Sequence, residues 1–297
     1  MDGVLIIDKP VGPTSHDVVN RVRRIFNTRK VGHTGTLDPF ATGVMVMLTG
    51  KATRLAKFAD REDKEYEATV RFGFATDTGD LTGAPIGDTG RSDISSEDIE
   101  SVLDRFRGEI MQVPPMYSAK KIDGKKLYEL ARRGEKVERP AVPVTIREIE
   151  VLTQRSTPGS LYRIRVRCSA GTYIRTLAED IAKALGTAAH LEELRRIASG
   201  SFSLEKSVRL EILAEEAEPS KYLLPMEVLV EGLPRFVLSS SRLQKTLNGL
   251  STRVFDVAFD AGQAVAMLSE NNDLVAIGKF VAGENVIQPT LVIGGNK

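Results

Sequence analysis

Segments with strand patterns alternate with segments of helical pattern along the 297 residues, and this alternation limits the folds that the chain can adopt. GVLIID at 3–8 and EYEATVRFGF at 65–74 are typical of strands, and VTIREIEVL and LYRIRVRCS flank RSTPGS as the two arms of a hairpin. Residues 15–26, 95–108 and 171–186 place apolar side chains at helical spacing. Hairpin-connected strands among helices predict an α+β fold, with a mixed, mostly antiparallel sheet flanked by helices.

A change of pattern near residue 232 divides the chain. The segment MEVLVEGLPRF precedes one polar helix, SSSRLQKTLNGL, and short alternating runs such as AVAMLS and LVAIGKF. We therefore predict a large first domain over 1–232 and a small β-rich domain over 233–297.

Composition excludes several classes of site. Cys168 is the only cysteine, so the chain cannot form an internal disulfide or a multi-cysteine zinc site, and three histidines make a histidine-rich metal cage improbable. The start MDGVLIIDKP lacks the pattern of a signal peptide, and apolar runs such as VMVML fall far below the ~18 residues of a membrane span. We expect a cytoplasmic, monomeric protein without metal or membrane contact.

The net charge of +1 hides a strong segregation of charge along the chain. Residues 58–112 hold six Lys/Arg and fourteen Asp/Glu, a net charge of −8, whereas residues 113–210 hold nineteen and eleven, a net charge of +8. Within the second segment, KKIDGKK and ARRGEK crowd basic residues together: Lys120, Lys121, Lys125, Lys126, Arg132 and Arg133. This density suits contact with a polyanion, although a solvated surface segment would have the same composition.

The stretch GHTGTLDPFATG, residues 32–43, displays one carboxylate, Asp38, in a turn. Gly32, Gly35 and Gly43 allow backbone angles that other residues avoid, and the proline after Asp38 disfavours a helical conformation there. The G-x-x-x-x-G-K-[ST] pattern of a phosphate-binding loop is absent, and a metal bound with His33 would require ligands that the chain barely supplies. A catalytic carboxylate and an aspartate that caps its own turn both remain open.

Other candidates stand in KEYEATVRFG, CSAGTYIRTL and LEELRRIASG. Tyr66 and Tyr173 are compatible with ordinary core aromatics, and Lys9 and Leu194, taken alone, with surface and core positions. Arg175 follows a Gly-Thr turn at a strand-to-helix junction, where its guanidinium could pair with a carboxylate through two hydrogen bonds. A surface ion pair is the alternative for Arg175.

Taken together, these motifs resemble the bacterial tRNA pseudouridine-55 synthases, the TruB family of pseudouridine synthases. The resemblance rests on LIIDKPVGPTSHDVV, KVGHTGTLDPFATGVMVMLTGKATRL, KEYEATVRFG, QVPPMYSAKKIDGKKLYELAR and CSAGTYIRTLAEDIAKALG, in family order over residues 4 to about 200. It implies a pseudouridine synthase fold with a C-terminal RNA-binding domain of PUA type. It also implies a basic RNA-binding insertion at about 113–145.

The resemblance implies an isomerase that flips uridine 55 out of the tRNA T-loop, breaks its glycosidic bond and rebonds the base through C5, with no cofactor. Asp38 matches the catalytic aspartate, Arg175 its ion-pair partner and Tyr66 the tyrosine stacked on the base. Tyr173 and Leu194 match pocket walls, His33 a histidine that binds the remodelled T-loop, and Lys9 the lysine of a supporting K-P motif. The insertion would contact the T-arm.

Two alternatives remain from the sequence. The chain could be an RNA-binding or tRNA-folding protein with incidental catalysis, as the basic segment and the tail allow. It could also be a nucleoside or glycoside hydrolase, since that chemistry shares cleavage of a glycosidic bond, but a hydrolase needs a second carboxylate and water.

Overall fold

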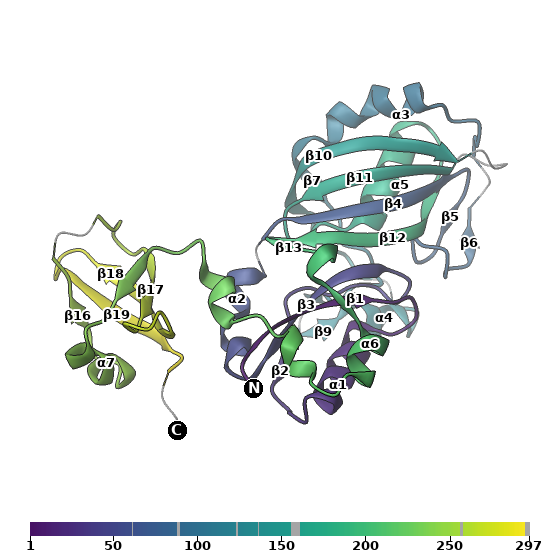
Figure 1. Ribbon diagram of the computed structural model, residues 1–297. Helices are drawn as coiled ribbons and strands as arrows, with labels where there is room; N and C mark the ends of the chain where they lie inside the picture. Colours follow the sequence, from purple (N-terminus) through teal and green to yellow (C-terminus); the bar gives the residue numbers. More distant parts are fainter. Residues whose placement is uncertain are drawn as a thin grey trace.

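A computed structural model describes residues 1–60, 62–87, 90–122, 124–135, 137–155, 161–255 and 258–294. A mixed sheet of ten strands runs through the larger part of the molecule, and a separate sheet of five strands forms the C-terminal part (Figure 1). The α+β class that the sequence predicts is confirmed.

The large sheet has the order β14-β1-β3-β12-β4-β11-β10-β7, with β2 paired to β3 and β13 to β12. Only the pairs β1–β14 and β3–β12 are parallel among these described strands, which confirms a mixed, mostly antiparallel sheet. The ten strands are β1 (Gly3–Lys9), β2 (Val31–His33), β3 (Thr42–Thr49), β4 (Lys64–Phe72), β7 (Gly108–Gln112), β10 (Val142–Arg155), β11 (Leu161–Cys168), β12 (Ala189–Ser199), β13 (Phe202–Ser203) and β14 (Val208–Arg209).

The helices begin where the sequence supplies caps. Thr14 with Asp17, and Ser95 with Asp98, form capping boxes at the starts of α1 and α3. The α-helices are α1 (Ser15–Ile25), α2 (Ala56–Ala59), α3 (Ser96–Leu103), α4 (Leu127–Ala131), α5 (Ile174–Ala184), α6 (Leu210–Glu215) and α7 (Ser240–Leu247). The 3₁₀ helices are η1 (Gly50–Leu55), η2 (Asp104–Phe106), η3 (Leu204–Lys206), η4 (Pro219–Tyr222) and η5 (Met226–Val230).

Two short ribbons lie in connections of the large sheet. They are β5 (Ala75–Thr76) with β6 (Pro85–Ile86), and β8 (Lys121–Ile122) with β9 (Lys125–Lys126). The second ribbon and α4 belong to the basic insertion at about 113–145. The predicted hairpin of β10 and β11 forms, but its connection at 156–160 lies outside the described residues.

The alternation along β4 explains how the strand presents a tyrosine to the interior. Tyr66, Ala68 and Val70 are buried and belong to the same core cluster as Leu177 and Ile181 of α5. The side chains between them, such as Glu67, face the opposite side and pair across strands with arginines of β11. Tyr66 is therefore directed toward the side of the sheet that α5 covers.

The five C-terminal strands follow the order β15-β17-β18-β19-β16 and pack with α7. They are β15 (Arg235–Val237), β16 (Thr252–Arg253), β17 (Ala264–Leu268), β18 (Leu274–Val281) and β19 (Val286–Val292). One core cluster joins Leu55 and Leu229 to Leu268 and Ile277, so apolar packing continues between the two sheets. None of the helices in the described part of the chain is long and apolar enough to cross a membrane.

Candidate active site

The turn that carries Asp38 is held by residues from the start of the chain. The Ser15 hydroxyl donates to Leu37 O and accepts from Leu37 N, at 2.9 and 2.8 Å. The Lys9 ammonium is fully buried and donates to the carbonyls of Pro10, Pro39 and Ala41. Since these bonds lie on both sides of Asp38, they fix the backbone from which the carboxylate projects.

Arg196 of β12 binds the same turn through its guanidinium. Its guanidinium is buried and donates to the carbonyls of Gly35, Thr36 and Val44. The prediction that all three glycines serve unusual backbone angles is wrong in part, because only Gly43, with φ +102°, has a positive φ. Gly35 instead leaves room for Arg196, whose guanidinium nitrogen would lie 3.3 Å from an added Cβ.

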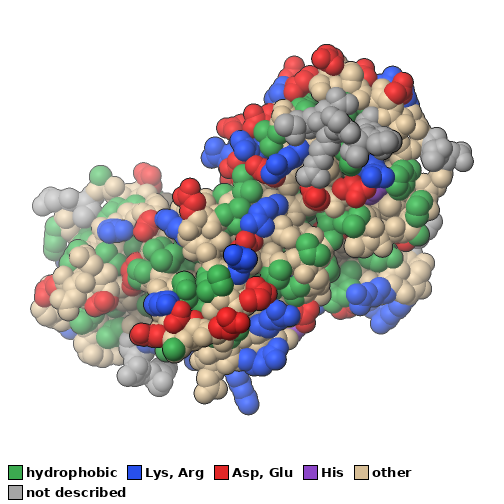
Figure 2. Space-filling view, turned by 45° about the vertical axis from the view of Figure 1, so that its right-hand side comes forward, with side chains coloured by type: hydrophobic (Ala, Val, Ile, Leu, Met, Phe, Trp, Pro, Cys, Tyr) green, Lys and Arg blue, Asp and Glu red, His purple; other side chains and the backbone are tan. Residues whose placement is uncertain are grey.

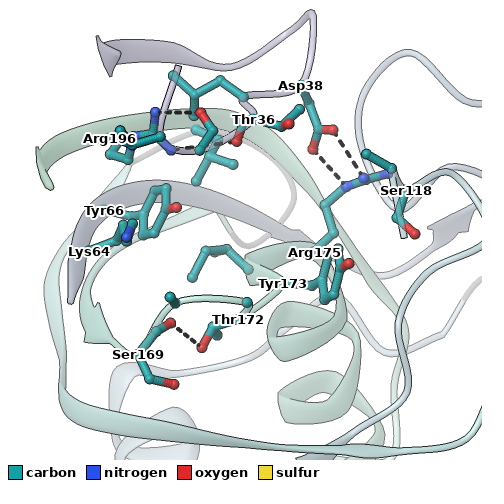
Figure 3. Close-up of a pocket in the computed structure, with 18 of the residues that line it drawn as sticks. Thr36, Asp38, Lys64, Tyr66, Ser118, Ser169, Thr172, Tyr173, Arg175 and Arg196 are labelled. Carbon is teal, nitrogen blue, oxygen red and sulfur yellow. Dashed lines mark hydrogen bonds and ion pairs between the residues drawn. The ribbon is translucent and has the colours of Figure 1, made fainter. Parts of the chain in front are cut away.

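Asp38 and Arg175 form a two-point ion pair (Figure 3). Arg175 Nε lies 3.1 Å from Asp38 Oδ2, and one terminal nitrogen donates to Oδ1 at 3.2 Å. The Arg175 side chain is 5% exposed, whereas that of Asp38 is 31% exposed. A molecule in the adjacent cavity can therefore reach the carboxylate, while the guanidinium fixes its orientation.

The rest of the Arg175 guanidinium binds two other loops. It donates to Thr78 O and to Tyr117 O, both at 2.7 Å, and it lies 3.6 Å from the buried carboxylate of Asp80. Asp80 is in turn held by the hydroxyls of Thr78 and Thr82. Sequence reasoning missed Asp80, because DTGDLTG looks like an ordinary polar loop.

Burial and three nearby charges shift the pKa of Asp38. Burial raises the pKa of Asp38, the Arg175 guanidinium lowers it, the Asp80 carboxylate raises it and the Lys9 ammonium lowers it. Burial lowers the pKa of Lys9 to about 8, against the effect of Asp38. The two cations favour the ionised carboxylate, whereas burial and Asp80 disfavour it.

A cavity of about 250 Å³ adjoins the ion pair, and it brings together five of the seven residues predicted for catalysis and nucleotide binding. Asp38, Tyr66, Tyr173, Arg175 and Leu194 all line it. Figure 3 shows Tyr66 on one side and Asp38, Arg175 and Tyr173 on the other. Burial raises the pKa of Tyr66, so its phenol stays protonated near neutral pH.

The other predicted residues lie outside the cavity wall. Lys9 lies beneath the turn, where it supports the architecture. His33 ends β2 and accepts a hydrogen bond from Gly35 N through Nδ1, while burial lowers its pKa.

The six basic residues are grouped on the ribbon β8–β9 and around α4. Among them, Lys126 and Arg132 lie over the Tyr128 ring.

Several cavity residues were not foreseen from the sequence. Ser118, Lys64 and Arg196 line the cavity. Gln112 supports its wall through hydrogen bonds to the backbone of Tyr173. The Gln112 amide donates to Tyr173 O at 3.0 Å and accepts from Tyr173 N at 2.8 Å. Their only sequence signal is their place inside the motifs QVPPMYSA, KEYEA and LRRIASG.

Asp38 is not the only carboxylate of this region. Asp60 lines the cavity, and Asp80 approaches Arg175 from its other side. Among the residues that the structure describes, no three His, Cys, Asp or Glu side chains are grouped so that they could hold a metal ion.

Comparison with known proteins gives concordant matches. Residues 23–174 match the profile of "TruB family pseudouridylate synthase (N terminal domain)", and residues 175–231 match "tRNA pseudouridylate synthase B C-terminal domain". The tRNA pseudouridine synthase B of Solibacter usitatus is 43% identical over 297 residues, covering 99% of this chain and 100% of that protein. That of Bacillus subtilis is 40% identical over 285 residues, covering 93% and 92%.

A solved structure is similar along nearly the whole chain. A protein of an H/ACA RNP bound to a substrate RNA containing 2′-deoxyuridine matches with a TM-score of 0.74 and 29% identity, over 99% of this chain and 85% of that one. A chain of a Cbf5-Nop10-Gar1 complex matches equally well, with 30% identity over 98% and 85%. The likeness thus includes the C-terminal sheet as well as the large sheet.

Proposed function

The chain belongs to the TruB family of pseudouridine synthases, and we propose that it converts uridine 55 of the tRNA T-loop into pseudouridine. It is an isomerase whose substrate is tRNA. The observation that carries the proposed mechanism is the two-point Asp38–Arg175 ion pair at the wall of a cavity lined by Tyr66, Tyr173 and Leu194.

The reaction moves one bond and one proton. The N1–C1′ bond breaks, the detached uracil turns, and a C5–C1′ bond forms while C5 loses its proton and N1 gains one. Asp38 acts on the nucleotide as nucleophile or base, for which it must be ionised. Arg175 is always charged, so it holds the carboxylate in one orientation and favours its ionised form against burial, which raises the pKa of Asp38.

The cavity walls keep the intermediate in place. Tyr66 stacks on the target base, and any help that it gives at C5 comes from a neutral phenol, since burial raises its pKa. Tyr173 and Leu194 enclose the detached uracil and exclude water, which would otherwise hydrolyse the sugar intermediate. Asp80 contributes no acid to the cavity, because hydrogen bonds and Arg175 occupy its oxygens.

The target base must leave its stack before it can enter the cavity, at a cost of a few kcal/mol. We assign His33 to the T-loop, because it follows the exposed residues Arg29 and Lys30 and lies beside the turn of Asp38. We assign the basic residues of the insertion to T-arm phosphates, residues 1–232 to the catalytic domain and residues 233–297 to an RNA-binding domain.

The substitution Asp38→Asn tests the catalytic assignment. It should leave tRNA affinity nearly unchanged and lower the rate of pseudouridine formation by ~10³-fold or more. Binding is measured by filter retention, and turnover by release of tritium from C5 of labelled tRNA. Near-normal turnover by the variant would refute the role of Asp38 as the essential group.

The product distinguishes the remaining alternatives. Carbodiimide labelling should detect pseudouridine at position 55 of a tRNA transcript, without any change of mass before labelling. Release of free uracil would instead indicate a hydrolase that uses Asp60 as its second acid. Tight tRNA binding without either product would indicate an RNA-binding protein.

A further inference from the structure

Ser118 places a buried hydroxyl at the wall of the cavity. The residue is 6% exposed, it lines the cavity, and its Oγ has no hydrogen-bond partner among the described residues. A buried hydroxyl without a partner costs free energy, so such groups are rare unless a ligand or water satisfies them.

The backbone around Ser118 is fixed close to the reacting carboxylate. The same terminal nitrogen of Arg175 donates to Tyr117 O at 2.7 Å and to Asp38 Oδ1 at 3.2 Å. Ser118 N donates to Met116 O, and Ser118 O accepts from Tyr128 N of α4. Figure 3 shows Ser118 beside the Asp38–Arg175 pair, on the side of the cavity away from Tyr66.

This location corresponds to the sugar of a bound nucleotide. If the base stacks on Tyr66, and if Asp38 acts near the glycosidic bond, the ribose lies on the Asp38 side of the cavity, where Ser118 also lies. A ribose 2′-hydroxyl both donates and accepts hydrogen bonds, as does a serine hydroxyl. The two groups are therefore complementary whichever of them donates.

A purely internal role for Ser118 is less well supported. Ser118 lies near enough to the Tyr173 hydroxyl to lower the pKa of Tyr173, against the larger effect of burial, which raises it. This effect is that of a weak contact between the two hydroxyls, which does not have the geometry of a full hydrogen bond, so Ser118 Oγ still lacks a full partner among the described residues. Tyr173 is held through its backbone by Gln112.

We propose that Ser118 is a substrate-binding residue whose hydroxyl binds the ribose 2′-hydroxyl of the flipped nucleotide. This inference rests on the proposed function. It makes the first turn of the basic insertion part of the nucleotide pocket, so the segment that binds the T-arm also contacts the reacting sugar.

The substitution Ser118→Ala separates binding from folding. Because it removes a buried hydroxyl without a partner, the thermal midpoint of the free enzyme should stay unchanged or rise. On a T-arm stem-loop RNA, kcat/KM should fall about three- to tenfold, the value of one lost neutral hydrogen bond. Ser207→Ala is the control: its hydroxyl donates to Leu204 O, so the midpoint should fall while kcat/KM stays unchanged.

The same RNA with 2′-deoxyuridine at the target position identifies the bond. With this substrate, wild type and Ser118→Ala should have equal affinity, measured by fluorescence anisotropy, because the partner of the hydroxyl is missing. A Tyr173→Phe variant should still respond to Ser118→Ala on the uridine RNA, because the proposed bond of Ser118 is to the ribose and not to Tyr173.

Three results would overturn the inference. They are an unchanged kcat/KM for Ser118→Ala, a lower thermal midpoint, or a loss of affinity that persists with 2′-deoxyuridine. If wild type itself formed no pseudouridine, the proposed function would fail instead, so the two failures are distinguishable.

Discussion

Arg175 is shared by two carboxylates, and this shared charge is central to the site. Asp38 makes the two-point contact with the Arg175 guanidinium, and a carboxylate oxygen of Asp80 lies 3.6 Å from a terminal nitrogen of the same guanidinium. Burial is the largest effect that raises the pKa of Asp38, and the Asp80 carboxylate raises it further, against the lowering effects of Arg175 and Lys9. Asp80 therefore both positions Arg175 and affects the pH at which Asp38 ionises.

The substitution Asp80→Asn tests both effects. The amide keeps an oxygen for Thr78 and Thr82 but no longer attracts Arg175, so turnover at neutral pH should fall about ten- to hundredfold. Because Asp80 raises the pKa of Asp38, its removal lowers that pKa, and the acidic limb of the rate profile should move to lower pH.

The control for this charge change is Asp104→Asn, which removes a carboxylate from an exposed ion pair with Arg107. Its pH–rate profile should match that of wild type. An acidic limb that moves to higher pH in Asp80→Asn would contradict the electrostatic assignment.

Single residues could be predicted where a motif carries them. Asp38, Tyr66, Tyr173, Arg175 and Leu194 were all expected at the site, and the structure places them around one cavity. Asp80 and Arg196 could not be predicted, because their roles depend on contacts with Arg175 and Gly35, which lie 95 and 161 positions away in the chain.

Gln112 connects two elements that the sequence leaves unrelated. Gln112 is the last residue of β7, and Tyr173 is the residue before α5. The Gln112 side-chain amide bonds the N–H and the C=O of Tyr173, as a neighbouring strand would. Gln112 therefore binds the backbone of the junction that presents Tyr173 and Arg175 to the cavity, in addition to the bonds that Arg175 itself makes.

The substitution Gln112→Leu should weaken this junction. The loss of both bonds leaves the Tyr173 N–H without its partner, whereas Tyr173 O still accepts from Leu177 N, so the free energy of unfolding should fall by about 1–3 kcal/mol. Turnover should fall about tenfold or more, because Tyr173 and Arg175 lose their fixed positions. Urea denaturation and tritium release measure the two effects.

Tyr162→Phe provides a control of similar cost. It removes a buried hydrogen bond to Ile94 O, at the side of the sheet near α3. This variant should lose stability without losing turnover. Equal losses of turnover in both variants would show that Gln112 acts only through general stability.

The long elements could be predicted, whereas the short ones could not. β4, β10, β11 and α5 have enough alternating or periodic positions to define them. Residues 50–59 divide into the short helices η1 and α2, and the two-residue ribbons have too few positions for any pattern.

The fold neutralises part of the charge that is segregated along the sequence, because Glu65 and Glu67 of β4 pair with Arg165 of β11, but the basic insertion keeps its charges at the surface. Figure 2 shows Lys and Arg side chains along the lower part of the region that contains the large sheet, at the height of α1 and α4 in Figure 1. Lys121, Lys125, Arg132 and Arg133 are exposed on the basic insertion. Contacts of these groups with phosphates would make tRNA binding depend steeply on salt.

Neutralising Lys121 and Lys125 to Gln tests this surface. The slope of log Kd against log salt concentration should decrease by up to about 2, since each lost phosphate contact contributes about 1. The paired control is Lys183→Gln with Lys206→Gln, two exposed lysines on α5 and η3. An equal change of slope in the control pair would assign the effect to overall charge.

The core cluster between the two sheets limits how far the C-terminal sheet can act as a separate module. Leu55 and Leu229 on one side pack with Leu268 and Ile277 on the other, and Arg54 donates to Val292 O. A chain cut at residue 232 would expose this apolar surface to water and would tend to aggregate. We therefore expect heating to melt both parts in a single cooperative transition, so the boundary near residue 232 separates two sequence patterns and not two independently stable units.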